Sequence, residues 1–232
     1  MENKNYLVVG GSYGIGLEVV KSLVGQNANV YVLARTEGDL PASNNIHFQE
    51  YDVLGEEKIV LPETLNGVVY CPGSINLKPF RSLKPDAFRS DFEINLIGAV
   101  KVLQAAQRLL QKTENSSVVL FSTVAVQQGM PYHSSVAASK GAIEGLARTL
   151  AAEWAPKVRV NVVAPSLTDT PLAARLLSSD ERRDTSAQRH PLKRIGTVSD
   201  ISEVVCFLLS QKSAWMTGQV LGVDGGISSL KV

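Results

Sequence analysis

The chain has 232 residues, of which 44% are hydrophobic and 19% are charged, and its formal net charge is +1. This length and apolar content suit a single globular domain over residues 1–232. The near-neutral charge, without a basic block, argues against a nucleic-acid partner, and no apolar run is long enough to cross a bilayer. The two cysteines lie in unlike apolar settings, which favours buried thiols over a disulfide or a metal site, and there is no room for a signal peptide before the first apolar run. We therefore expect a cytoplasmic protein without a metal.

Apolar runs alternate with helix-like patterns along the chain. Several runs are continuously apolar, which is typical of parallel strands buried on both faces. We expect strands at 6–9, 29–33, 46–49, 67–70, 118–122, 158–163 and 220–223. We expect helices at 15–24, 86–111, 136–154 and 200–209, the last with Ser199 as its N-cap. The alternation predicts an α/β fold of the Rossmann type, with a doubly wound parallel seven-stranded sheet between two layers of helices.

A glycine-rich loop joins the first expected strand to the first expected helix. Glycines allow close approach of a diphosphate to the backbone, and the helix start offers unpaired N–H groups and the positive end of its dipole. This placement predicts a dinucleotide cofactor, although glycines alone would also suit an ordinary turn. The residues expected to contact the cofactor here are Gly10, Ser12, Tyr13, Gly14, Ile15 and Gly16.

The end of the second expected strand bears on the choice of cofactor. An acidic residue there would bind the ribose 2′-hydroxyl of NAD, but the chain has Arg35 followed by Thr36. An arginine can pair with a phosphate in bidentate fashion, so we favour NADP(H) over NAD(H), the alternative being a solvated surface arginine. Asp52, after the third strand, suits a hydrogen bond to the adenine amino group or an ordinary turn. Residues 36–45 contain Gly38 and Pro41 and are expected to form a loop instead of a helix.

Taken with further ordered motifs, these residues resemble the classical short-chain dehydrogenase/reductase family over essentially the whole chain. The matches include the glycine loop, the pair Asp52-Val53, Asn95 in the fourth helix, the segment Ala138-Ser139-Lys140-Gly141-Ala142, and Arg159 to Pro165 with the sixth strand. The resemblance implies a Rossmann fold, a nicotinamide dinucleotide, and a homodimer or homotetramer built on helices 86–111 and 136–154. The second of these helices is rich in alanine and glycine, which permits close helix packing against either the sheet or another subunit. By the same resemblance, Val53, Cys71, Gly73, Pro165, Thr168 and Thr170 also contact the cofactor.

The family's chemistry uses a serine, a tyrosine and a lysine, and this chain departs from that set. Lys140 matches the lysine, and Asn95 matches the asparagine that supports a proton-relay water. The tyrosine position, four residues before the lysine, holds Val136, which has no proton to donate, and the serine position holds Thr123. Loss of a positioned general acid typically lowers the rate by about 100- to 10,000-fold. Smaller departures are Val9 for a threonine, Tyr70-Cys71-Pro72-Gly73 for Asn-Asn-Ala-Gly, and Ser166 for a glycine.

Three sources of the proton remain open at this point. His133 lies seven residues before Lys140, the spacing of the tyrosine in the related enoyl reductases, and a histidine near its normal pKa is a workable acid. Tyr132 is adjacent, and water is the third source. Alternatively, both side chains belong to a loop at the rim of the pocket, with Ser134 or Ser135 capping the helix that follows.

The segment 167–195 is expected to cover the substrate. Its leucines, Leu172, Leu176 and Leu177, suggest a short apolar lid helix, and its charged run 180–184 suggests a solvated turn. Arg175 or Arg189 could meet an anionic substrate.

The sequence therefore predicts an NADP-dependent oxidoreductase acting on a small carbonyl or alcohol substrate. A different class, an NADP(H)-binding pseudoenzyme acting as a sensor or silent subunit, is the alternative, and a pocket closed by Val136 and Pro72 would favour it. A third hypothesis is reduction of an activated C=C bond, which needs the His133 side chain to face the nicotinamide.

Overall fold

The computed structural model describes residues 1–231 and contains one parallel sheet. Within that range the sheet has seven parallel strands, as predicted, and their order is β3-β2-β1-β4-β5-β6-β7. The strands are β1 (Asn5–Val9), β2 (Asn29–Ala34), β3 (Ile46–Glu50), β4 (Gly67–Tyr70), β5 (Ser116–Phe121), β6 (Val158–Pro165) and β7 (Val220–Val223). The strand order reverses between β1 and β4, where the carboxyl ends of an open α/β sheet usually bind a ligand.

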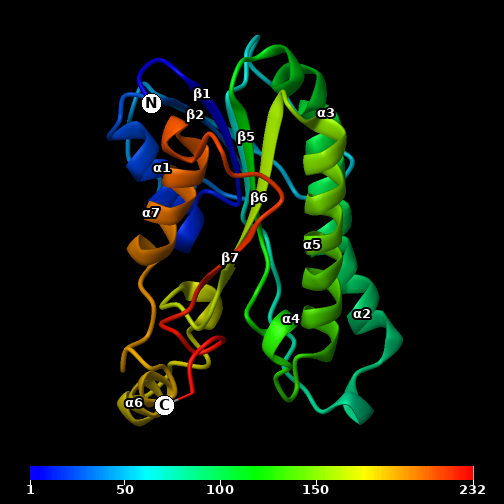
Figure 1. The fold of residues 1–232 in the computed structure, drawn as a ribbon, viewed down its shortest axis with the longest axis vertical. Helices are drawn as coiled ribbons and strands as arrows, with labels where there is room; N and C mark the ends of the chain where they lie inside the picture. Colours follow the sequence, from blue (N-terminus) through cyan, green and yellow to red (C-terminus); the bar gives the residue numbers. More distant parts are fainter. Residues whose placement is uncertain (232) are drawn as a thin grey trace.

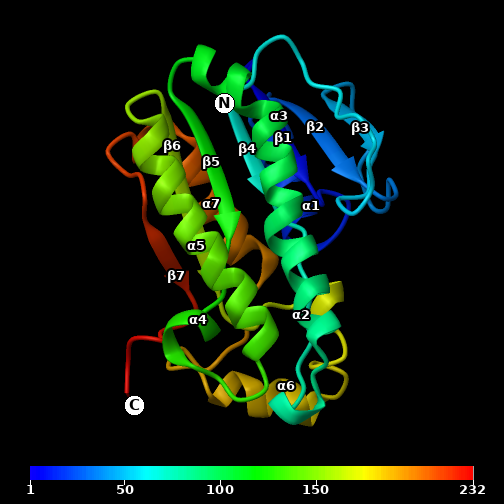
Figure 2. The same ribbon diagram turned by 90° about the vertical axis from the view of Figure 1, so that its right-hand side faces the viewer.

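Helices cover both faces of the sheet (Figures 1 and 2). On one face lie α1 (Gly14–Val24) and α7 (Val198–Leu209), and on the other lie α3 (Gly98–Lys112) and α5 (Ser134–Trp154), with α2 (Pro85–Phe92) leading into α3. On each face, apolar side chains of the helices pack against apolar side chains of the sheet and form a buried core. Central strand residues such as Val8, Val69 and Leu120 are fully buried, which explains why these strands are continuously apolar.

The helix predicted at 86–111 is interrupted by a π-helical turn, η2 (Glu93–Ile97), between α2 and α3. The turn is tied down by Tyr70, whose hydroxyl donates to the Ile94 carbonyl at 2.6 Å, and by Asn95, whose Nδ2 donates to the Asp91 carbonyl at 2.8 Å. Residue periodicity does not reveal such a turn, because it adds a single residue to an otherwise regular pattern. Turns of this kind are frequent at functional sites, and this one carries Asn95.

Two predicted helix caps were wrong. Helix α7 begins after Thr197, not Ser199, because the Thr197 side chain accepts from the Asp200 amide while the Asp200 carboxylate accepts from the Thr197 amide. Neither Ser134 nor Ser135 caps α5, whose N-cap is His133 without a side-chain cap bond.

The segment 167–195 differs from its predicted form. The leucines form no lid helix, since only a 3-10 turn, η3 (Pro171–Ala173), and irregular turns occur there. The charged run instead begins a helix, α6 (Asp180–Gln188), because Ser179 caps it and Asp180 and Glu181 suit the positive end of its dipole. Residues 36–45 form a loop, as predicted.

The remaining elements are short: η1 (Phe80–Ser82), α4 (Ala125–Gln128) and η4 (Gln211–Ser213). In the part of the chain that the structure describes, no helix has both the length and the apolarity required to span a bilayer.

Candidate active site

Two cavities lie along the carboxyl edge of the sheet, with volumes of about 310 Å³ and 610 Å³. The smaller lies over the ends of β1 and β2, and the larger lies between β5, the start of α5 and the segment 167–195. Cys71 and Gly73, just after β4, line both cavities, so the two meet at the strand-order reversal. The arrangement suits an elongated ligand with two parts.

The glycine loop has the backbone geometry that a diphosphate site requires. Gly10 and Gly14 have φ of 73° and 55°, values that favour glycine. A Cβ on Gly16 would collide with the Gly10 carbonyl, so the loop closes onto the start of α1 only with glycine there. Tyr13, the N-cap of α1, makes no side-chain cap bond, which leaves the first amides of the helix open to an anion.

The smaller cavity is lined by the residues predicted to hold the adenosine end. Arg35 and Thr36 are exposed on its rim, and within residues 1–231 no hydrogen bond or ion pair ties the Arg35 guanidinium to another group. Asp52 and Val53 also line it, and Asp52 Oδ1 accepts from the Leu54 amide at 3.0 Å. This bond is a turn contact, and it leaves the second carboxylate oxygen of Asp52 for a ligand.

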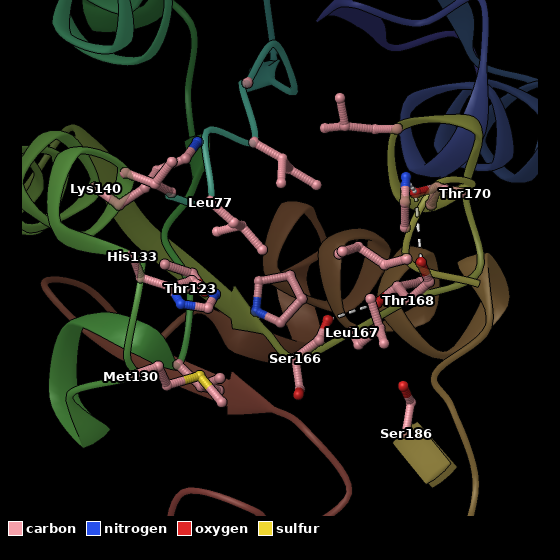
Figure 3. A pocket seen from close by; sticks show the side chains of 18 of the residues that line it. Leu77, Thr123, Met130, His133, Lys140, Ser166, Leu167, Thr168, Thr170 and Ser186 are labelled. Atoms are coloured by element: carbon pink, nitrogen blue, oxygen red, sulfur yellow. Dashed lines mark hydrogen bonds between the residues drawn. The ribbon is translucent and has the colours of Figure 1, made fainter. Parts of the chain in front are cut away.

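The larger cavity is lined by Lys140 and Val136 from α5 and by Thr123 just after β5. Figure 3 shows Lys140 and Thr123 on the same side of the cavity. Thr168 and Thr170 face them from the other side. Val136 lies one helical turn before Lys140 and contributes only methyl groups to the wall. Thr123 Oγ1 accepts from the Ala125 amide, so its hydroxyl proton is free to be donated into the cavity. With 610 Å³ of space, the cavity is not closed by Val136 and Pro72.

Lys140 is a buried cation without a partner. Its side chain is 8% exposed, and no hydrogen bond or ion pair reaches it from the described residues. Burial lowers the Lys140 pKa from 10.5 to about 8, and the nearby Cys71 and Asp91 act in the opposite direction. Lys140 is therefore mostly charged at neutral pH, in a cavity where an oxygen-rich ligand would replace its lost hydration.

The two side chains considered as proton donors differ in position. His133 lines the cavity, whereas Tyr132 does not and is 59% exposed. His133 Nδ1 lies 2.7 Å from the Pro131 carbonyl, which can only accept, so the neutral ring carries its proton on Nδ1 and presents Nε2 as an acceptor. Of the two arginines considered for an anionic substrate, Arg189 lines the cavity and Arg175 does not.

Asp91 and Ser74 are site residues that the sequence interpretation missed. Asp91 is 0% exposed, and its Oδ1 accepts from Ser74 Oγ at 2.6 Å and from Asn76 Nδ2 at 2.7 Å. Asn95 Nδ2 donates to Ser74 Oγ at 3.0 Å, and Ser74 lines the larger cavity. One signal was available: Asp91 and Asn95 occupy helix positions on the same face as the apolar Phe88 and Phe92, where a buried acid is unusual.

A second polar pair joins the covering segment to the sheet. Ser166 Oγ, at the end of β6, lies 2.8 Å from His190 Nε2, and His190 Nδ1 lies 2.9 Å from the Ser186 carbonyl. Because that carbonyl accepts, Ser166 donates to His190 in the neutral ring. Ser166 occupies the position that the resemblance assigns to glycine, and it lines the larger cavity.

Comparison with known proteins identifies the family. Residues 10–228 match the family model described as enoyl-(acyl carrier protein) reductase. A tropinone reductase homologue of Arabidopsis thaliana is 35% identical over 98% of this chain and 94% of its own length. This chain belongs to the classical short-chain dehydrogenase/reductase family. L-xylulose reductase of Bos taurus, another relative, is 30% identical over 97% of both chains.

Solved structures agree with the family assignment. A short-chain dehydrogenase/reductase of Mycobacterium ulcerans has a TM-score of 0.88 and 29% identity over 98% of this chain and 90% of its own. ElxO with NADP bound has a TM-score of 0.86 and 25% identity over 98% of this chain and all of its own. The chain is thus a member of an oxidoreductase family with a Rossmann fold. Within residues 1–231 no cluster of three or more histidine, cysteine, aspartate or glutamate side chains could hold a metal ion.

Proposed function

We propose that this short-chain dehydrogenase/reductase is an NADP-dependent oxidoreductase that acts on a small carbonyl or alcohol substrate with a non-standard proton donor. The observation that carries the proposal is the meeting of the two cavities at Gly73. One cavity has a free arginine at its rim, and the other has Lys140 and Thr123 in its wall. A dinucleotide laid along this edge would span both.

The preference for NADP rests on the rim of the smaller cavity. Arg35 and Thr36 offer a guanidinium and a hydroxyl where a 2′-phosphate would lie, and the acid that NAD requires at this strand end is missing. ElxO, which shares the fold, has been solved with NADP bound, and a tyrosine-to-phenylalanine variant of it has been solved with NADPH bound. The open glycine loop and the uncapped start of α1 fit the diphosphate of such a cofactor.

The groups that line the larger cavity, and Asn95 behind Ser74 in its wall, have distinct parts in the proposed reaction. When bound, the reduced nicotinamide supplies a hydride. Lys140 would hold the nicotinamide ribose and favour negative charge developing on the substrate oxygen, Thr123 would donate a hydrogen bond to that oxygen, and Asn95 would support a relay water. The proton must come from a group other than residue 136, and His133 is the sequence candidate that lines the cavity.

The lining of the larger cavity favours a substrate with a substantial apolar part. Leu77, Met130, Leu172 and Leu176 contribute much of its wall. Arg189 lines it as well, so a carbonyl compound with a terminal anionic group is a suitable first class to assay.

Helices α3 and α5 present the surface that we propose for a homodimer or homotetramer. The outward side of α5 carries small residues, including the exposed Ala138 and Gly145, and a Cβ on Gly145 would meet no atom within 4 Å. Small side chains on an exposed helix allow a second helix to approach closely. Light scattering of the protein, with Gly145→Glu as the disrupting variant, would test this proposal.

The test of function is NADPH oxidation against a carbonyl panel, comparing the wild type with Val136→Tyr and Lys140→Met. Turnover by the wild type that is lost in Lys140→Met would support the proposal. Turnover by Val136→Tyr alone would mean that the natural protein no longer catalyses this reaction. If neither turns over although both bind NADPH, the proposal fails.

A further inference from the structure

A serine and a histidine at the larger cavity have no part in the proposed oxidoreduction. Ser166 lines the cavity directly after β6, and its Oγ lies 2.8 Å from Nε2 of His190. His190 itself is 3% exposed, so its ring is shielded from solvent behind the serine. A hydroxyl that faces a cavity and is bonded to an imidazole on its other side is the arrangement of an activated serine nucleophile.

The ring of His190 is oriented through its other nitrogen. Nδ1 lies 2.9 Å from the Ser186 carbonyl, which can only accept, so Nδ1 carries the proton of the neutral ring. Nε2 is then an acceptor, and the Ser166 hydroxyl donates to it. Nucleophile, base and orienting group therefore follow one another as nucleophilic catalysis requires, with a backbone carbonyl as the orienting group.

Backbone contacts from three segments hold the pair in place. The Ser166 amide donates to the Val223 carbonyl at 3.3 Å, which ties the serine to the end of β7. The His190 amide donates to the Ala187 carbonyl at 3.1 Å, at the end of α6. Gly225 packs against the histidine, since a Cβ on this glycine would lie 3.4 Å from the Cβ of His190. Because both residues are positioned in this way, the base needs no rearrangement to receive the serine proton.

The surroundings of Ser166 suit an ester with an apolar acyl chain. Met130 and Leu167 lie on either side of Ser166 in the view of Figure 3, and Leu172 and Leu176 also line the cavity. The amide of Leu167 makes no hydrogen bond within residues 1–231. The amide that follows a nucleophilic serine is a common donor to the oxyanion of a tetrahedral intermediate, so this amide is available for that part.

We propose that Ser166 and His190 form a second catalytic pair, which hydrolyses carboxylic esters with an apolar acyl chain through an acyl-serine. The inference goes beyond the proposed oxidoreduction and uses no nucleotide. Ser166 Oγ bonds to the ester carbon while its proton moves to His190 Nε2, and that proton passes to the leaving alkoxide as the ester C–O bond breaks. Water then adds to the acyl carbon and gives a proton to His190, and the proton returns to Oγ as the acyl–serine bond breaks. Ester and water thus become acid and alcohol, with no change of oxidation state.

The test uses the intact chain without nucleotide, so its outcome is independent of the proposed oxidoreduction. The protein is incubated with an alkyl fluorophosphonate, and tandem mass spectrometry locates the label. In parallel, the hydrolysis of p-nitrophenyl butyrate and octanoate is followed by absorbance. We expect the label on Ser166 and a burst of nitrophenolate, because the acyl-serine forms before water releases it. Ser166→Ala should lose the label and lower the hydrolysis by at least about 100-fold.

Two further variants separate catalysis from structure. His190→Gln removes the base, and we expect it to slow labelling by at least about 100-fold. Ser122→Ala is the matched control, because Ser122 also lines the cavity and donates to a buried group, Glu144 Oε1 at 2.7 Å, and it should leave labelling unchanged. Circular dichroism checks that each variant is folded. If His190→Gln fails to fold, the comparison of Ser166→Ala with Ser122→Ala still decides, since Ser166 is only partly buried.

Several results would overturn the proposal. One is a label on Lys140 or Thr123 in place of Ser166. Another is ester hydrolysis that survives in Ser166→Ala, or a folded His190→Gln that is labelled at the wild-type rate. A wild-type protein in which Ser166 reacts no faster than Ser122 would show that the pair only fastens the covering segment to the sheet.

Discussion

Removing the Arg35 guanidinium tests the cofactor preference directly. Arg35 is exposed on the rim of the smaller cavity, and in the described chain no hydrogen bond or ion pair engages its side chain, so Arg35→Ala removes no internal polar interaction. A hydrogen bond to a charged group contributes about 1.5–3 kcal/mol, but an exposed ion pair contributes only about 0.2–1 kcal/mol. For a bidentate contact at an exposed rim we expect a loss of about 1.4 kcal/mol of binding free energy, which is a roughly tenfold higher dissociation constant for NADPH.

The assay is fluorescence titration of NADPH and NADH at two salt concentrations. Arg35→Ala should weaken NADPH and leave NADH unchanged, because only NADPH has a 2′-phosphate. The difference should shrink at high salt, since exposed charges are screened. Arg108→Ala is the matched control, because Arg108 is also exposed but lies on α3, away from both cavities. An equal loss for both cofactors, or a wild type that binds NADH more tightly, would refute the assignment.

Three further changes test the site and its frame. Lys140→Met should abolish turnover yet raise the free energy of unfolding by about 3 kcal/mol in urea titrations at neutral pH, because folding lowers the Lys140 pKa from 10.5 to about 8. Since the folded chain therefore binds this proton less well than the unfolded chain, the free energy of unfolding of the wild type should rise as the pH increases from about 8 to about 10.5. A fall over that pH range would contradict the assignment. Thr197→Ala should lower stability by about 1 kcal/mol through loss of the α7 capping box, whereas Ser199→Ala, at the cap predicted from sequence, should have little effect. Gly16→Ala should destabilise the fold by about 1–3 kcal/mol and weaken NADPH, since its methyl group would meet the Gly10 carbonyl; binding that is unchanged in titrations would argue against a tightly closed loop.

The sheet and the glycine loop could be predicted because their signals are local. Continuous apolar runs such as that around Val119 reflect burial on both faces, and a strand, a glycine turn and a helix start follow one another in the chain. The helices on both faces of the sheet could be predicted as well, because their apolar residues recur with the helical period.

The remaining features depend on contacts between distant residues. The π-helical turn at Asn95 is held by Tyr70, whose bond to Ile94 spans 24 residues, and periodicity within one helix contains no trace of that bond. The Ser74–Asp91 pair likewise joins a loop after β4 to the end of α2. Even the α7 cap was misplaced, because Ser199 and Thr197 are equally acceptable cap residues until the reciprocal bond of Asp200 is seen.

The junction of the two cavities at Cys71 and Gly73 determines how a dinucleotide would be held. Its two nucleotides would act as tethered ligands, so that seating one raises the local concentration of the other at its own cavity. A small loss of binding affinity at the exposed Arg35 rim would then weaken the binding of the nicotinamide end near Lys140, although no atom near Lys140 has changed. Conversely, a nicotinamide fragment lacking its adenosine should bind far more weakly than its own contacts suggest.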